Sequence, residues 1–275
     1  MATEPFDRAL RRRRHAHAQG YFGRADFLHS AIAAEVRERV AGVARDFVAV
    51  LDLGGPAPVW SIPAGPKAVR LALAGPATVV ADEDRLPFAD ASFDLVVSVG
   101  GLATVSDLPG ALVQARRVLR PDGLFIAAFA GGMSLSELRS DLIDADIAIT
   151  GGAAARIAPM VEAQAAAGLL QRAGFAMPVA DVERLTVRYG SIFALLDDLT
   201  AMGARSVLVS RSPLRRDVLA NAAARFQNRA AHGGKISVTV EIIHLAGWAP
   251  APGQPVPLKP GSATTSLAKA LGSRI

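Results

Sequence analysis

Residues 50–88 read VLDLGGPAPVWSIPAGPKAVRLALAGPATVVADEDRLPF, and this segment carries the strongest fold signal in the chain. It opens with the end of an apolar run, 47–53, which brings Asp52, Gly54 and Gly55 to a turn. A buried strand followed by a glycine turn is typical of α/β domains that hold a phosphate or nucleoside there. The sequence therefore predicts such a domain, with these three residues as its first candidate ligand contacts.

Prolines interrupt the loop that should follow this strand. Pro56 and Pro58 occupy the third and fifth positions of the expected G-x-G-x-G loop, and Pro63 and Pro66 follow. Glycine allows close backbone approach and leaves an N–H free to donate, whereas proline fixes φ and has no N–H. We expect the domain to fold normally and its affinity for a nucleoside to be lowered.

The rest of the chain continues in α/β rhythm. We expect helix over 5–45, 108–119, 160–174, 192–202 and 213–231, and strands over 47–53, 68–74, 78–81, 93–99, 124–130, 179–189 and 235–248. Ser134 and Glu137 have capping-box spacing, which predicts a further helix beginning near residue 135. This pattern predicts a mainly parallel sheet flanked by helices, divided into a helical arm (1–45), one domain (46–248, with a helical insertion about 134–174) and a flexible tail (249–275).

The charge is unevenly distributed along the chain. The overall net charge is +5, but residues 1–24 contribute +4 and residues 249–275 contribute +3, which leaves −2 for the centre. The basic character therefore describes the two ends and not the domain itself. The run Arg11, Arg12, Arg13 and Arg14 predicts either contact with an anionic membrane or an acidic protein, or simply a solvated helix face. We expect no nucleic-acid partner, because no aromatic platform accompanies these arginines.

The residue types present exclude several chemistries. The chain has no cysteine, so disulfides, thiolate zinc sites and cysteine nucleophiles are excluded, and its five histidines lack metal-ligand spacing. No serine lies in a G-x-S-x-G turn, and no catalytic residue is assigned. No apolar run reaches the ~18 residues of a membrane span, and the start of the chain is charged. These features predict a cytoplasmic protein, either free or held peripherally at the inner face of the membrane.

The ordered series of strand, glycine turn, LPFADASFDLVVS and VLRPDGLFIAAF resembles the class I S-adenosylmethionine-dependent methyltransferases, over about residues 47–129. In this resemblance Asp52 and Gly54 match the glycine-loop motif, and Asp82 matches the acid near the adenine. Gly100, after the fourth strand, joins Asp52, Gly54, Gly55 and Asp82 as a cofactor-binding candidate. The resemblance implies a Rossmann-like fold and S-adenosylmethionine as cofactor.

Segments beyond this core resemble one branch of that superfamily. DLPGALVQARRVLRPDGLFIAAFAGGMSLSELRS, VRYGSIFALLDDLTAMGA, FDRALRRRR and GSATTSLAKAL are similar to the mitochondrial respiratory complex I assembly factor and its α-proteobacterial relatives. This branch implies hydroxylation of an arginine on the quinone-binding complex I subunit in place of methylation, and so a protein partner. A neighbouring group, the carrier-protein methyltransferases of biotin synthesis, does methylate.

Two further departures concern the cofactor. No Asp or Glu lies between Asp52 and Asp82, where a carboxylate at the end of the second strand would accept the ribose hydroxyls. The branch usually has a His-Trp pair where this chain has Ala103 and Thr104. Losing the carboxylate and the loop donors should weaken binding by roughly two to four powers of ten. We also expect the helix between the second and third strands to be reduced to a turn.

Each candidate residue also has a structural interpretation. The alternative for Asp52 is a loop cap, that for Gly54 and Gly55 is turn geometry, and that for Asp82 is a solvated acidic loop. Arg70 suggests a 2′-phosphate contact more weakly. Arg188, Tyr189 and Arg211 are candidates for a substrate cleft, and Trp60 for a plug in the vacated pocket.

Three functions stay open from the sequence. The first is a complex I assembly factor-like protein with a degraded S-adenosylmethionine loop that acts on or binds a respiratory-chain subunit. The second is an active S-adenosylmethionine-dependent methyltransferase, and the third is a cofactor-free scaffold.

Overall fold

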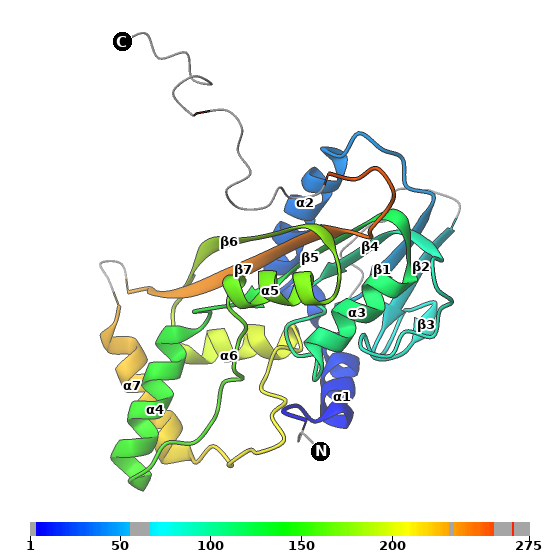
Figure 1. The fold of residues 1–275 in the computed structure, drawn as a ribbon. Coiled ribbons are helices and arrows are strands. Elements are labelled where there is room, and N and C mark those ends of the chain that lie inside the picture. Colours follow the sequence, from blue (N-terminus) through cyan, green and yellow to red (C-terminus); the bar gives the residue numbers. More distant parts are fainter. Residues whose placement is uncertain (1–3, 56–66, 231–233, 256–265, 267–275) are drawn as a thin grey trace, which may run out of the picture.

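The computed structural model describes residues 4–55, 67–230, 234–255 and 266. Within them, seven strands form one sheet in the order β3-β2-β1-β4-β5-β7-β6 (Figure 1). Strands β1 to β5 run parallel, and β7 pairs antiparallel with both β5 and β6. The bounds are β1 Ala49–Leu53, β2 Lys67–Ala72, β3 Val79–Val80, β4 Phe93–Val99, β5 Leu119–Gly131, β6 Ala176–Tyr189 and β7 Ile236–Trp248. The mainly parallel α/β fold is thus confirmed.

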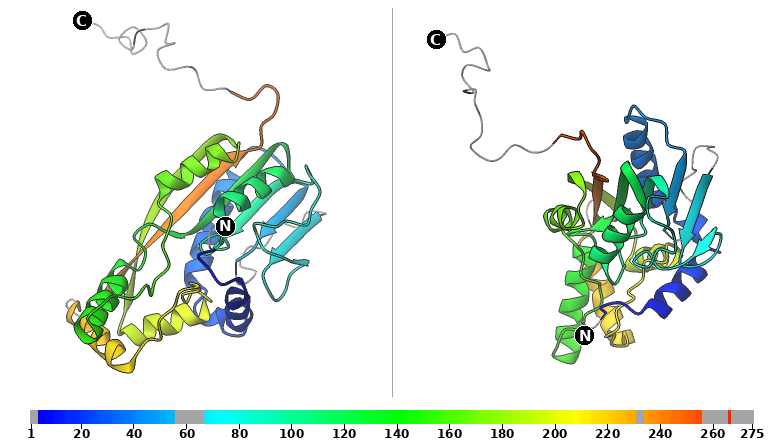
Figure 2. Two further views of the ribbon diagram at one scale, coloured as in Figure 1. Left: turned by 60° about the horizontal axis from the view of Figure 1, so that its bottom comes forward. Right: turned by 45° about the vertical axis from the view of Figure 1, so that its right-hand side comes forward.

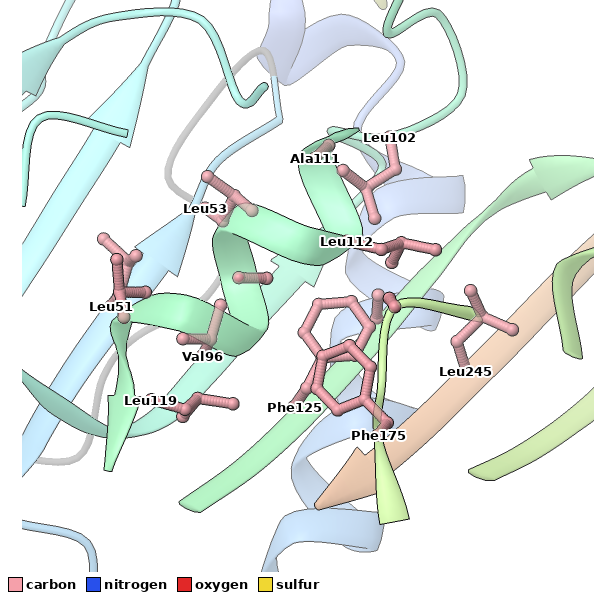
Figure 3. Close-up of a cluster of buried hydrophobic side chains, with 14 of the residues drawn as sticks. Leu51, Leu53, Val96, Leu102, Ala111, Leu112, Leu119, Phe125, Phe175 and Leu245 are labelled. Atoms are coloured by element: carbon pink, nitrogen blue, oxygen red, sulfur yellow. The ribbon is translucent and has the colours of Figure 1, made fainter. Parts of the chain in front are cut away.

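Helices cover both faces of the sheet (Figures 1 and 2). Helices α3 (Leu108–Val118) and α5 (Ala163–Arg172) pack on one face, where Leu112 lies over Phe125 of β5 and the Phe125 and Phe175 ring centroids are 5.2 Å apart (Figure 3). Helix α2 (Phe27–Ala41) covers the other face through Ile32 and Val36. Parallel strands require this double cover because both of their faces are buried.

A third cluster lies beyond one end of the sheet. It joins α4 (Ser136–Thr150), α6 (Ile192–Ala201) and α7 (Arg216–Asn228) to the adjoining ends of β6 and β7 (Figure 2). Its largest fully buried side chain is Phe226 of α7. These helices enclose the space next to the carboxyl ends of β4 and β5, which is where α/β folds place their ligands.

Several local predictions are confirmed by the structure. Strand 93–99 has the predicted bounds. Gly174, just after the end of α5, has the left-handed conformation predicted for a helix cap, with φ +83°. Residues 73–78, between β2 and β3, form bends without a helix, as the short spacing predicted. The predicted prolines, Trp60 and most of the predicted tail fall outside the described residues.

Three local predictions are wrong in detail. The single helix expected over 5–45 is divided into α1 (Arg8–Ala18), a 3-10 turn (Phe22–Arg24) and α2. Strand β5 begins at Leu119 and not at residue 124 as predicted. Leu119 pairs with Phe93 of β4, and the register shifts before Leu124 pairs with Leu95. The predicted tail is held at its start, where the Ala249 N–H donates to the Gly123 carbonyl at 2.8 Å.

The predicted capping box does not form. The Ser134 hydroxyl donates to the carbonyls of Gly131 and Glu241, and Glu137 accepts from the Thr239 hydroxyl and N–H. Both side chains therefore tie the start of α4 to β5 and β7. Tertiary partners replaced the local ones because β7 supplies donors at this point.

Candidate functional site

The glycines predicted to contact a cofactor lie where the ends of β1 and β4 meet. This is the switch point of the strand order, the expected ligand position in a parallel sheet. A Cβ on Gly55 would lie 2.4 Å from the Val99 carbonyl oxygen, and one on Gly54 would lie 2.7 Å from the Leu71 carbonyl oxygen. Both glycines are thus required by close backbone packing between strands, whatever ligand contact they also make.

Asp52, the predicted ligand carboxylate, forms an ion pair inside the protein. Its side chain is 2% exposed and pairs with Nη1 of Arg70 on the neighbouring strand β2. The other nitrogens of Arg70 donate to the carbonyls of Gly55 and Pro76, both at 3.1 Å. The guanidinium therefore occupies the start of the loop, and its donors serve the protein itself instead of a 2′-phosphate.

Burial sets the protonation of this pair. Desolvation raises the pKa of Asp52, and the adjacent Arg70 opposes that rise. A buried carboxylate without a cation would carry a large desolvation penalty. Arg70 consequently supplies the counter-charge that Asp52 needs in this position.

The end of strand β2 is where nucleotide-binding folds place the ribose. Strand β2 ends at Ala72 beside the end of β1, and no Asp or Glu occurs between Asp52 and Asp82. A free carboxylate at this strand end is the group that holds ribose hydroxyls in nucleotide-binding folds. At this strand end the sequence therefore offers no carboxylate for a ribose, and the Asp52 carboxylate is already paired with Arg70.

Asp82 is not part of a solvated loop face. Its side chain is 6% exposed, and its Oδ2 lies 2.6 Å from Nη2 of Arg12 and 3.4 Å from Nη1 of Arg8. The next two acids also pair with helix α1, Glu83 with Arg11 at 2.7 and 2.8 Å and Asp84 with Arg8. The acidic cluster is therefore the docking surface for α1.

Arg11 is the most deeply placed residue of the arginine run. It is 4% exposed and also donates to the Gly101 carbonyl at 2.8 Å and to the Thr104 hydroxyl at 3.0 Å. Arg12 is half exposed but paired, whereas Arg13 is exposed. Arg11 is therefore not available for the predicted contact with an anionic membrane or an acidic protein. It fixes α1 across the loops after β3 and β4.

A cavity of about 340 Å³ lies beyond the ends of β4 and β5. Gly100, Ala103 and Thr104 line it at the β4 end, and Tyr189 and Arg211 line it as the sequence predicted. Burial and the neighbouring Asp198 raise the pKa of Tyr189, so its phenol stays neutral. Arg188 instead lies exposed on β6, outside this lining.

Two histidines that the sequence analysis did not select line the same cavity. His15 of α1 and His29 of α2 are 7% and 8% exposed, and His29 Nδ1 is buried without a hydrogen-bond partner among the described residues. Burial, with Arg11 and His29 adding to it, lowers the pKa of His15 to about 3, and burial lowers the pKa of His29 to about 4. Both imidazoles are thus neutral at pH 7.

A sequence signal for His29 does exist. It shares the apolar helix face of Ile32 and Val36 at i+3 and i+7, a spacing that predicts burial. His15 carries no comparable signal, since it lies in the arginine-rich helix. Its burial follows from the docking of α1.

Metal and membrane features were also sought in the described part of the chain. It contains no group of three or more histidine, aspartate or glutamate side chains arranged to hold a metal ion. None of its helices combines the length and apolarity needed to cross a bilayer.

Comparison with known proteins places these features in context. Residues 38–127 match a family model described as a methyltransferase domain. The chain is 35% identical to "Arginine-hydroxylase NDUFAF5, mitochondrial" of Danio rerio over 96% of its own length and 88% of that protein. It is 33% identical to a malonyl-[acyl-carrier protein] O-methyltransferase of Laribacter hongkongensis over 66% of its length and 60% of that protein.

A solved structure supports the fold. A Bacillus halodurans protein described as a methyltransferase superposes with a TM-score of 0.52 at 14% identity, covering 80% of this chain and 99% of that one. At this identity the likeness concerns the architecture alone.

Proposed function

Since the chain belongs to the class I S-adenosylmethionine-dependent methyltransferase superfamily, in the branch of the mitochondrial arginine hydroxylase, we propose that it is an assembly factor-like protein that acts on or binds a respiratory-chain subunit. The observation that carries this proposal is the 35% identity over 96% of the chain. That length includes α1 and the cluster of α4, α6 and α7, which lie outside the matched methyltransferase model of residues 38–127.

S-adenosylmethionine has a minor part, or none, in this proposal. Asp52 is already paired with Arg70, and the end of β2 offers no carboxylate for a ribose. The cofactor would have to displace a buried ion pair before it gained its own contacts. The methyl-transfer chemistry that the cofactor supplies in this superfamily is therefore not assigned to the chain.

An active methyltransferase is the second candidate. Its support is the methyltransferase-domain match together with Asp52 and Gly54 at their motif positions. A cofactor-free scaffold is the third. It would use the same surfaces as the first candidate without modifying the partner.

Affinity purification with mass spectrometry separates the three candidates. We expect the full chain, expressed in its own cells, to enrich a respiratory-chain subunit without a bound nucleoside. An added oxygen on an arginine of that subunit, lost when the gene is deleted, would assign the modifying function, and its absence would favour the scaffold. A methyl group that depends on the gene would support the second candidate, and recovery of no respiratory-chain subunit would contradict the first.

The cofactor proposal has its own test in Arg70→Ala. Removing the guanidinium frees Asp52 for a ligand amine, and a charge-assisted hydrogen bond is worth about 1.5–3 kcal/mol, so affinity for S-adenosylmethionine should rise roughly ten- to a hundredfold. Calorimetric titration of the wild-type protein and the variant measures this change. Arg85→Ala is the control, since Arg85 is 69% exposed and lies 3.9 Å from Glu4.

Thermal unfolding of both variants establishes that they are folded before titration. Micromolar binding by the wild-type protein, or equal affinity in folded Arg70→Ala, would contradict the proposal.

The cellular location follows from the same proposal. We place the protein on the cytoplasmic side of a respiratory membrane, where such a subunit is accessible. Any anionic-membrane contact falls to Arg13 and the half-exposed Arg12, because Arg11 is buried.

A further inference from the structure

The cavity next to Gly100 has an apolar interior. Its walls come from helices α2, α4 and α6 and from the ends of strands β5, β6 and β7. The apolar side chains that line it include Leu28, Ile32, Leu138, Leu142, Leu195 and Val240. Sites of about 300–1,000 Å³ with such walls hold small organic ligands, so 340 Å³ accommodates an aliphatic chain of moderate length.

The charged residues in the lining are all basic. Arg14, Arg156, Arg205 and Arg211 line the cavity, and no Asp or Glu does so among the described residues. Arg156 is neutralised by Asp146, which accepts from its Nε and Nη2 at 2.6 Å each. The other three arginines thus determine the charge of the cavity.

These three arginines lack sufficient counter-charge. Among the described residues, the acid paired with Arg211 is Asp7, at 3.6 Å, and Arg14 donates to the Ser206 carbonyl. Arg205 is exposed and has no ion pair or hydrogen bond within the described segments.

The three arginines form one basic group at the opening of the cavity. All three arginines line the same cavity, and Arg14 donates to the carbonyl of Ser206, the residue after Arg205. Burial lowers the pKa of Arg14, and Arg205 and Arg211 lower it further, whereas Asp7 opposes this change. Arg205 and Arg211 are also exposed, so the basic group stands where the cavity opens to solvent.

We propose that this cavity binds an amphipathic anion, with its aliphatic chain in the apolar interior and a carboxylate or phosphate head against Arg205 and Arg211. Guanidinium groups recognise both heads through paired N–H donors. A neutral head would leave Arg205 without a counter-charge, and a cationic head would be repelled. The inference does not depend on the proposed function, which concerns a protein partner.

A head-group series tests the proposal by calorimetric titration of the full chain. The probes are decanoate, decyl phosphate, decanol and decylguanidinium, which share one chain and differ in the head. We expect decanoate or decyl phosphate to bind at least tenfold more tightly than decanol, with no measurable binding of decylguanidinium. Whichever anion binds more tightly indicates a carboxylate or a phosphate source.

Chain length supplies an independent measurement. Each methylene buried from hexanoate upward should tighten binding about fourfold until the cavity is full. Ala130→Leu, which adds volume to the lining, should end that gain at a shorter chain.

Charge variants test the head site. Arg205→Gln and Arg211→Gln should each weaken decanoate binding by about tenfold or more, whereas Arg188→Gln, exposed and outside the lining, should leave it unchanged. Arg205 has no hydrogen-bond or ion-pair partner in the described part of the chain, so its variant should fold normally.

The proposal is overturned if no anion binds, if decanol binds as tightly as decanoate, or if Arg188→Gln has the same effect as Arg205→Gln. Tighter binding of decylguanidinium would also overturn it and would favour a guanidinium substrate. Capture of a respiratory-chain subunit is measured separately, so either idea can fail alone.

Discussion

Replacing Arg11 by methionine should lower the free energy of unfolding by about 3–5 kcal/mol, because it leaves Glu83 as a buried charge without its partner. Glu83 is 0% exposed, and both of its oxygens accept hydrogen bonds from Arg11. Burial already raises the pKa of Glu83, with Arg11 opposing the rise, so loss of the guanidinium removes its main compensation. Thermal unfolding should show a decrease in Tm of roughly 10 °C.

Two comparisons isolate the cause of this loss. Arg13→Met changes an exposed arginine on the same helix and should have little effect. Arg11→Met combined with Glu83→Leu should recover much of the stability, because apolar side chains often replace a buried ion pair without loss. If Arg11→Met were as stable as Arg13→Met, the docking of α1 through this pair would be disproved.

Mild acid should destabilise the protein through His15 and His29. Their pKa values are about 3 and about 4 in the folded protein, against 6.5 for an unperturbed histidine, so in mild acid the unfolded chain binds protons that the folded chain does not. Their contribution to stability is full above pH 6.5 and is lost as pH falls. Between pH 7 and about pH 5 we expect a loss of about 2 kcal/mol per histidine.

Urea unfolding at a series of pH values measures this dependence. His29→Gln should remove about half of the slope in that window, whereas His17→Gln, on the exposed side of α1, should leave it intact. Carboxylates with lowered pKa values, such as Asp146 beside Arg156, lose their contribution at lower pH and do not mask the effect. An unchanged slope in His29→Gln would show that His29 is protonated in the folded protein.

Much of the fold could be predicted because its signals are local. The strand at 93–99 is apolar on both faces, and Asp107 and Pro109 mark the start of α3, so bounds there agree closely with the sequence. The sequence does not predict the break between α1 and α2, although Gly20 and Gly23 lie in it, because apolar residues at helical spacing continue beyond it.

The candidate site was harder to predict because its contacts link distant residues. Arg11 and Glu83 are 72 residues apart, and Arg70 reaches Asp52 only because β1 and β2 are aligned in register. The spacing of residues in a sequence indicates contacts within a helix turn or along a strand. It therefore could not predict either of these two ion pairs. The sequence gives one hint that the two regions attract each other, namely the basic first segment and the net negative centre.

The position of β7 has a consequence for how the chain is made. This strand is inserted between β5 and β6, so β6 finds its partner in the sheet only when residues 236–248 have been synthesised. A ribosome paused near residue 230 would hold a nascent chain with an unpaired β6 and a bare edge on β5, the kind of surface that promotes misassociation. Completion of the sheet is therefore a late event in biosynthesis, governed by the final strand.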